Sequence, residues 1–366
     1  MSNLPFSGFR SVPLTEDLAR SVSITELGNY TSLSPEAARV LIERVNELEI
    51  SRLDLDGLTS ISEDVATALA LRTNALSLGG LTSISVEVAS ALARQKGILC
   101  LNGLTSISEE AAIALARHKG MLFFYGLTSI SGRVAEALAR NEGELCLGLT
   151  SISVEAAEAL ARNEWKLFLD GLTSISAEVA AALARHKNWL SLYGLVSISA
   201  EAAGFLAQHK APLFLNGLNS ISVEVAIALA RHLDGLSLDG LTSTSEEVAT
   251  VLAGHRDGLS LGGLMSISEE VATALAQHPG ELSLNGLTSL SEREATALAG
   301  HKGALFLNGL KSISEEVAVA LARQEGRLCL AGLTSISEKV AAAISLHNSV
   351  LIRESLTSTS QVRLPA

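Results

Sequence analysis

The chain has 366 residues, enough for two or three ordinary domains or for one repeat array. Its formal net charge of −12 and its pI near 5.2 argue against nucleic acid or anionic membranes as partners, because binding to phosphate needs clustered Lys and Arg. Apolar residues make up 48% of the chain and aromatics only 4%, so we expect an aliphatic core.

The first residues form a segment of their own. They lack a basic head followed by an apolar stretch, so we expect no classical signal peptide. We therefore predict a cytoplasmic protein, or one secreted by a route without such a signal. Residues 35–48 read PEAARVLIERVNEL, a pattern that predicts a longer and more charged helix than any later one. Residues 1–50 are interpreted as an N-terminal helical cap.

A 23-residue repeat fills residues 51–350, about 13 copies in all. The motif Gly-Leu-Thr-Ser-Ile-Ser, with substitutions, recurs from Gly57 to Gly332 at intervals of 23 residues, except for one interval of 22 between Gly126 and Gly148. Self-similarity at such a period is typical of solenoids, in which no unit can bury its apolar face alone and stacking creates a continuous core.

One copy shows how each repeat is expected to fold. Leu76-Ser77-Leu78 alternates apolar and polar residues, which predicts a short strand with one buried face. Gly80 permits a tight turn, and Ser85 stands where a helix N-cap belongs. The segment that follows, VEVASALA, places its apolar residues on one helical face. Each repeat is therefore predicted to be strand, turn, short helix, turn.

The pattern Leu-x-Leu-x-Gly-Leu-x-x-Ile over about residues 51–360 resembles the bacterial leucine-rich repeats, and its turn is similar to that of their surface-protein class. This resemblance implies an α/β solenoid: a curved, right-handed leucine-rich-repeat superhelix with a parallel sheet on its concave face and short helices on its convex face. The commonest family pattern places Asn after the strand, but only some repeats have it, at Asn102, Asn216, Asn285 and Asn308. We expect the Gly-Leu-Thr-Ser-Ile-Ser turn to replace an asparagine ladder.

Residues 351–366 are interpreted as a C-terminal cap and tail. Arg353 stands at an inward leucine position there, and Ser355 replaces the repeat glycine. Caps at both ends stop edge-to-edge stacking. We therefore expect a finite, monomeric array.

Eight histidines fall at one repeat position near the helix ends. They are His118, His186, His209, His232, His255, His278, His301 and His347. Such a column could build a metal ladder or a pH sensor, or the side chains could serve the carbonyls at helix C-termini. Stacked helices would set them about 8–10 Å apart, too far for two to share a zinc ion. The structural role is favoured, and we predict no metal site.

No sequence motif indicates catalysis. Cys100 and Cys146 are expected two strands apart, about 10 Å, beyond the reach of a disulfide, and Cys329 occupies the same strand position. There is no phosphate loop, dinucleotide fingerprint, calcium loop or nucleophile elbow. The chain is predicted to be no enzyme and to need no cofactor.

The outward strand positions carry the candidate binding site, because repeats diverge there. Contiguous exposed aromatic residues mark interaction surfaces. The predicted contact residues are Met121, Phe123, Tyr125, Cys146, Phe168, Trp189, Tyr193 and Phe214. An alternative is that the rings lie across small neighbours and only stabilise the sheet.

These patterns predict a non-enzymatic scaffold that binds a protein or peptide on its concave strand face. Two alternatives remain open. One is a structural or self-assembling rod, for which the faces would be equivalent along the array. The other is a host-directed bacterial effector, a role that the resemblance to bacterial leucine-rich repeats implies.

Overall fold

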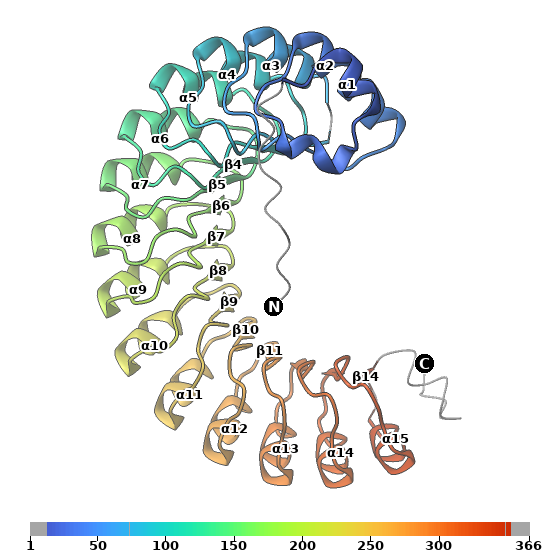
Figure 1. The fold of residues 1–366 in the computed structure, drawn as a ribbon. Coiled ribbons are helices and arrows are strands. Elements are labelled where there is room, and N and C mark those ends of the chain that lie inside the picture. Colours follow the sequence, from blue (N-terminus) through green and yellow to red (C-terminus); the bar gives the residue numbers. More distant parts are fainter. Residues whose placement is uncertain (1–12, 73, 348, 353–366) are drawn as a thin grey trace. The chain divides into compact units, whose positions relative to one another are not determined.

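The computed structural model describes residues 13–72, 74–347 and 349–352. It consists of two compact units. The first comprises the residues up to Leu172 together with Arg185–Trp189, and the second comprises Thr173–Ala184 and the residues from Leu190 onward. In each unit, helices lie on one face and strands on the other (Figure 1). Arg353 and Ser355, with the rest of the predicted C-terminal cap beyond residue 352, lie outside the described residues.

Helices precede the first strand of the first unit. They are α1 (Glu16–Ser21), the 3-10 helix η1 (Ile24–Asn29) and α2 (Pro35–Glu47). The 13 residues of α2 are the helix predicted for residues 35–48. It begins after Ser34, whose hydroxyl accepts a hydrogen bond from the Ala37 N–H at 3.1 Å, and η1 lies against the first strand.

The first unit stacks its strands in chain order. The strands are β1 (Arg52–Asp54), β2 (Ala75–Ser77), β3 (Leu99–Cys100), β4 (Leu122–Phe124), β5 (Leu145–Leu147) and β6 (Leu167–Phe168). Neighbours pair in parallel, with the first leucine of each strand in register with that of the next. The helices between them are α3 (Glu63–Leu69), α4 (Val86–Leu92), α5 (Glu109–Leu115), α6 (Gly132–Leu138) and α7 (Val154–Leu160).

The second unit repeats this plan. Its strands are β7 (Leu190–Ser191), β8 (Leu213–Phe214), β9 (Leu236–Ser237), β10 (Leu259–Ser260), β11 (Leu282–Ser283), β12 (Leu305–Phe306), β13 (Leu328–Cys329) and β14 (Val350–Leu351), again parallel and in chain order. Its helices are α8 (Ala177–Leu183), α9 (Ala200–Leu206), α10 (Val223–Leu229), α11 (Glu246–Leu252), α12 (Glu269–Leu275), α13 (Glu292–Leu298), α14 (Glu315–Leu321) and α15 (Glu338–Ile344).

A serine starts each repeat helix, as the sequence predicts. In α4 the Ser85 hydroxyl accepts a hydrogen bond from the Val88 N–H at 3.3 Å, which satisfies one of the free donors of the first turn. In α13 the cap is reciprocal, because the Glu294 carboxylate also accepts from the Ser291 N–H. Each repeat helix has seven residues, too few to be stable alone. Packing against neighbouring repeats must therefore hold it.

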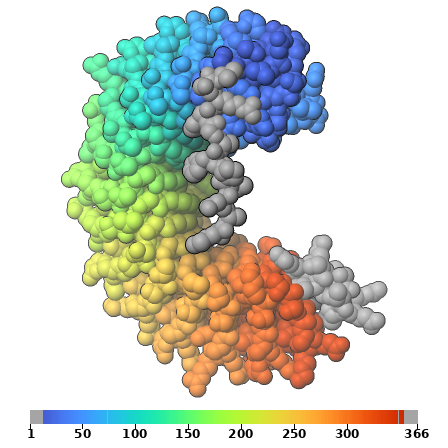
Figure 2. Space-filling view, in the orientation of Figure 1, coloured from blue at the N-terminus to red at the C-terminus, as the bar shows by residue number. Residues whose placement is uncertain are grey.

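Aliphatic side chains from strand, turn and helix meet between the two faces. In one repeat, Leu76, Leu78, Leu81 and Leu92 are fully buried, and Val88 is 5% exposed. Successive repeats contact their sequence neighbours, so colours run in order along each unit (Figure 2). The prediction of an α/β solenoid with a parallel sheet and short helices is confirmed, whereas its curvature and right-handedness stay predictions.

An asparagine and aspartate ladder links successive repeats just after the strands. The Asn308 side-chain oxygen accepts from the Ala331 N–H at 2.9 Å, and that of Asn285 from the Asn308 N–H at 2.9 Å. The same contact recurs from Asp56, Asn102, Asn216 and Asp239 to the backbone 23 residues on. The expectation that the turn replaces the ladder is wrong. An aspartate or asparagine in one repeat accepts a hydrogen bond from the backbone N–H 23 residues later, whatever side chain that residue has.

No described helix has the length and apolar character that a bilayer crossing needs.

Candidate functional site

The predicted contact residues divide between the two units. Met121, Phe123, Tyr125, Cys146, Phe168 and Trp189 belong to the first, and Tyr193 and Phe214 to the second. Each group is described on its own.

In the first unit, aromatic rings stand on the strand face of β4 and β6. The rings of Phe123 and Tyr125 are tilted by 49° with their centroids 5.7 Å apart. Tyr125 is 46% exposed, while Phe123, Phe168 and Met121 are half-buried. This surface offers apolar area to a partner, and part of that area is already covered by neighbouring side chains.

Trp189 lies beside charged side chains in the same unit. It is 43% exposed, and the Lys166 ammonium sits 4.8 Å from the centroid of its ring, a cation–π geometry. The same ammonium pairs with the Glu144 carboxylate at 2.9 Å. The charges of Lys166 and Glu144 therefore neutralise each other.

The thiol of Cys146 lies beneath this surface rather than on it. Cys146 is 2% exposed. Burial raises the pKa of its thiol to about 12, helped by the nearby carboxylates of Asp170 and Glu144. Burial also raises the pKa of the Tyr125 phenol to about 12, helped by the nearby Cys146 and Asp170 side chains. The Cys146 side chain is therefore covered by its neighbours, whereas the Tyr125 ring beside it is exposed.

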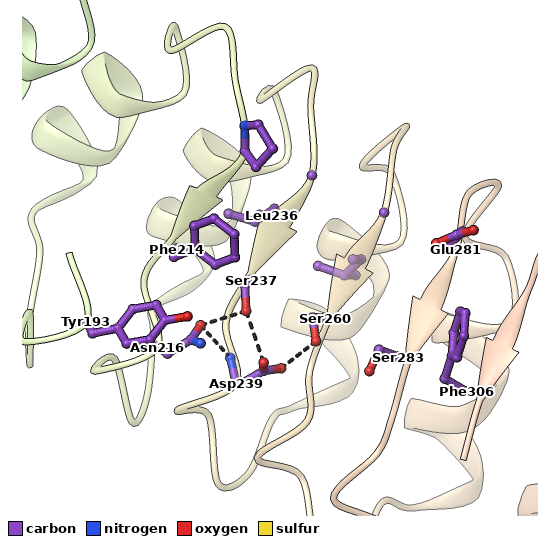
Figure 3. A pocket seen from close by; sticks show the side chains of 14 residues that line it. Tyr193, Phe214, Asn216, Leu236, Ser237, Asp239, Ser260, Glu281, Ser283 and Phe306 are labelled. Atoms are coloured by element: carbon purple, nitrogen blue, oxygen red, sulfur yellow. Dashed lines mark hydrogen bonds between the residues drawn. The ribbon is translucent and has the colours of Figure 1, made fainter. Parts of the chain in front are cut away.

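In the second unit, a pocket opens on the strand face between two aromatic walls (Figure 3). Tyr193 and Phe214 form one wall, edge to face, with ring centroids 6.0 Å apart. Phe306 stands at the other end. The pocket has a volume of about 300 Å³, at the small end of the range for ligand sites.

Polar side chains on β9 and β10 form the floor. The Ser260 hydroxyl donates to the Asp239 carboxylate at 2.6 Å, and the Gly262 N–H donates to the same oxygen at 2.6 Å. The Ser237 hydroxyl lies 2.7 Å from the Asn216 side-chain oxygen and 3.0 Å from the second Asp239 oxygen. One Asp239 oxygen therefore accepts two hydrogen bonds, while the single hydroxyl proton of Ser237 is shared between Asn216 and the other Asp239 oxygen.

Two glycines create the hollow. Gly235 and Gly258 stand in the strand column that holds Trp189, Pro212 and Glu281 in neighbouring repeats. A Cβ at Gly258 would meet no atom within 4 Å, and one at Gly235 only the Pro212 Cβ at 3.9 Å. This pocket was not predicted from the sequence, because large side chains were taken as the mark of a binding surface. The signal that could have revealed it is a glycine at this column position in two consecutive repeats, flanked by repeats that have larger residues there.

The histidines occupy a buried position in the loop that leads from each helix to the next strand. The rings of His209, His232, His255, His278 and His301 stack in the second unit, with centroids 6.1–6.3 Å apart and planes within 5° of parallel. The predicted spacing of 8–10 Å is wrong, because these loops lie closer to the strands than the helix axes do. Among the described residues, no group of three or more acidic, cysteine or histidine side chains could hold a metal ion.

Other polar residues share the histidine position, a relationship not predicted from the sequence. The His118 ring nitrogen contacts the Gly97 carbonyl of the preceding repeat at 3.0 Å. The Gln324 amide donates to the Gly303 carbonyl at 2.7 Å, and the Asn163 amide to the Asn141 carbonyl at 3.2 Å. These side chains join one loop to the loop before it rather than serving their own helix ends.

Comparison with known proteins gives similarity of fold only. No protein-family model matches the chain, and no curated protein sequence matches it. A leucine-rich-repeat protein of Leptospira interrogans is 19% identical over 95% of this chain and 94% of its own, with a TM-score of 0.41. An internalin of Listeria monocytogenes is 17% identical over 86% of this chain and 93% of its own, with a TM-score of 0.44. The functional proposal therefore rests on the residues of this chain.

Proposed function

We propose that the chain is a non-enzymatic scaffold that binds a protein or peptide partner through the strand face of its repeats. The observation that carries this proposal is the exposure of aromatic side chains on that face. Tyr125, Trp189 and Tyr193 are each 43–46% exposed. Tyrosine and tryptophan contribute most strongly to protein interfaces, and exposing them without a partner is unfavourable.

The backbone of the strands favours recognition by side chains. In both units the strand N–H and C=O groups are largely used by neighbouring strands, as between Leu236 N–H and the Gly258 carbonyl at 2.9 Å. A partner therefore cannot add a strand to the middle of the sheet. It has to be bound by the residues that project from the strand face, where the repeats differ.

The chemistry of the thiols supports a role other than catalysis. A nucleophilic cysteine needs a lowered pKa, whereas burial raises the pKa of Cys100, Cys146 and Cys329.

We propose further that the array is monomeric, that residues 51–350 form it, and that the protein is cytoplasmic or secreted without a classical signal.

The test compares two variants that each lose exposed apolar surface. The strand-face variant is Tyr125→Ala, Trp189→Ala, Tyr193→Ala. The control replaces exposed residues on helices α5, α10 and α14, namely Ile113→Ala, Ile227→Ala and Val319→Ala, which are 40–43% exposed. Circular dichroism should show both variants folded. Quantitative affinity purification from a lysate of the encoding organism then identifies partners, and calorimetry with the purified partner gives Kd.

We expect the strand-face variant to weaken binding at least tenfold while the helix variant leaves it unchanged. Equal binding by both variants would contradict the proposal. If the wild type binds no partner and the strand-face variant has the lower Tm, the aromatic residues stabilise the sheet, and the structural rod replaces the scaffold as the function.

A further inference from the structure

We propose that the pocket between Phe214 and Phe306 receives a cationic side chain, arginine or lysine, from an extended segment of a protein partner. This inference rests on the proposed function and specifies which partner chemistry the second unit recognises. It depends on the walls of the pocket, on the space that two glycines leave, and on the exposed carboxylate of Glu281.

Aromatic walls suit a cation with an apolar stem. Tyr193 and Phe214 form one end of the pocket and Phe306 the other. A guanidinium or ammonium group is attracted to the face of an aromatic ring, and the methylene groups of arginine or lysine can lie against the rest of the ring. Phe306 is one strand from Glu281 and can meet a cation beside that carboxylate, while half-buried Phe214 and exposed Tyr193 leave ring surface for apolar groups of the same segment.

The missing side chains at Gly235 and Gly258 leave room for a side chain from outside. The hollow lies over β9 and β10, on strands whose middle residues are Ser237 and Ser260. With strands about 4.8 Å apart, β8 and β12 lie roughly 19 Å apart. A segment of about six extended residues spans that distance, at about 3.3 Å per residue. The pocket itself, about 300 Å³, has room for a side chain of that segment.

Glu281 provides the charge that selects a cation. It is exposed, lines the pocket, and has no ion-pair partner among the residues that the structure describes. Its counterpart in the first unit, Glu144, occupies the same strand column and is paired with Lys166 at 2.9 Å. The column places Gly258 and Ala304 beside Glu281, and neither can neutralise it.

The remaining charges reinforce this preference. Asp239 is the other charged residue that lines the pocket, and one of its oxygens accepts hydrogen bonds from the Ser260 hydroxyl and the Gly262 N–H. These donors are neutral and do not cancel its charge, so Asp239 adds negative potential to the floor. The backbone of Arg327 lies two strands from that of Glu281, about 10 Å; both side chains act on the pKa of Cys329, but Arg327 does not line the pocket. Arg256 and Lys302 stand in loops and do not line the pocket. A carboxylate ligand would meet two acids and no cation.

The experiment uses phage-displayed random linear dodecapeptides as the probe and the full chain as bait. Three variants accompany the wild type. Gly258→Leu fills the hollow, Glu281→Gln removes the charge at nearly constant shape, and Ala75→Leu places the same new side chain in the same strand column of the first unit. Selected peptides are synthesised, with their basic residues and with glutamine in their place, and Kd is measured by fluorescence anisotropy at two salt concentrations.

We expect wild type and Ala75→Leu to select peptides enriched in arginine or lysine beside apolar residues. Affinity should fall at least tenfold with Gly258→Leu, with Glu281→Gln and with the glutamine peptides, and it should weaken as salt rises. Binding that survives Gly258→Leu, peptides without basic residues, or no selected peptide would each overturn the inference. The proposed function has its own test in the aromatic variants, so it can stand if this inference fails.

Discussion

The imidazole rings of His255 and His278 stack in parallel, with their centroids 6.1 Å apart and their planes within 1° of each other. Both side chains are at most 1% exposed. Neutral rings in such a row do not repel one another, whereas two protonated neighbours would repel at this distance in a buried site. Burial accordingly lowers the pKa of both imidazoles, and neighbouring rings lower it further: His232 acts on His255, and His255 and His301 act on His278.

Stability should fall as the pH drops below about 6.5. Burial lowers the pKa of His232, His255, His278 and His301 below the ordinary value of 6.5, although Asp234 and Asp257 oppose the shift at the first two. The unfolded chain therefore takes up protons first, so the stability from neutral histidines is present above 6.5 and is lost toward the lower folded pKa. Each histidine contributes at most about 1.4 kcal/mol per pH unit in that window. Urea unfolding between pH 8 and 5.5 measures the loss.

The chain supplies the matched control for this pH dependence. Gln95 and Gln324 occupy the same position in other repeats and donate to the preceding loop without titrating. A His255→Gln, His278→Gln variant should keep its fold and show a smaller loss of stability between pH 7 and 5.5. An unchanged pH profile would mean that these two rings are not the groups that titrate.

Replacing a leucine in the middle of the core should divide the unfolding transition. Leu215 is fully buried, so Leu215→Ala should cost about 2–5 kcal/mol. Repeats contact mainly their neighbours, and a weak repeat therefore allows the array to unfold in parts. Calorimetry should show a broadened or split transition. Leu233→Ala, at a residue that is 73% exposed, should leave the profile unchanged.

Replacing two glycines of one repeat by alanine should change the free energy of unfolding to very different extents. A Cβ at Gly263 would overlap the backbone carbonyls of Asp239 and Leu241, which cannot move independently of the ladder. A Cβ at Gly258 meets nothing within 4 Å. Gly263→Ala should therefore destabilise the protein by about 1–3 kcal/mol, while Gly258→Ala should be within about 0.5 kcal/mol of the wild type. Equal Tm values for the two variants would contradict the close packing of successive turns.

The Cys146 thiol should be almost unreactive in the folded protein. With a pKa of about 12, its thiolate fraction at pH 8 is on the order of 10⁻⁴. In a Cys100→Ser, Cys329→Ser background, labelling by a thiol-specific disulfide reagent should be at least about 100-fold slower than for the same chain in guanidinium. Rapid labelling under native conditions would show that the thiol is accessible from the strand face.

The repeat pattern carries most of the fold. Leucines at fixed spacing, a serine before each helix and a glycine at each turn each have a local physical reason, so strands, helices and their parallel stacking follow from one repeat. The chemistry shared between repeats was harder to predict. His118, Gln324 and Asn163 have different side chains, but each donates a hydrogen bond to the preceding loop. A search for identical residues does not group them.

The candidate site was predictable only in part. The aromatic column indicates which face differs between repeats, but it does not reveal that Cys146 is covered or that Gly258 leaves a hollow. Coverage depends on how far a neighbouring ring leans across its strand. A hollow depends on side chains that are absent. Neither property belongs to a single repeat, so neither can be deduced from the motif alone.

The ladder of Asn285, Asn308 and the Ala331 N–H has a consequence for the length of the chain. A side chain here needs only a backbone donor 23 residues later, whatever the residue that carries it. Copying or removing one whole repeat therefore leaves each new junction chemically identical to the old ones. A 22-residue copy instead deletes the ladder position, as in the interval from Gly126 to Gly148. The array can be lengthened in whole repeats, like a polymer whose monomer is 23 residues long.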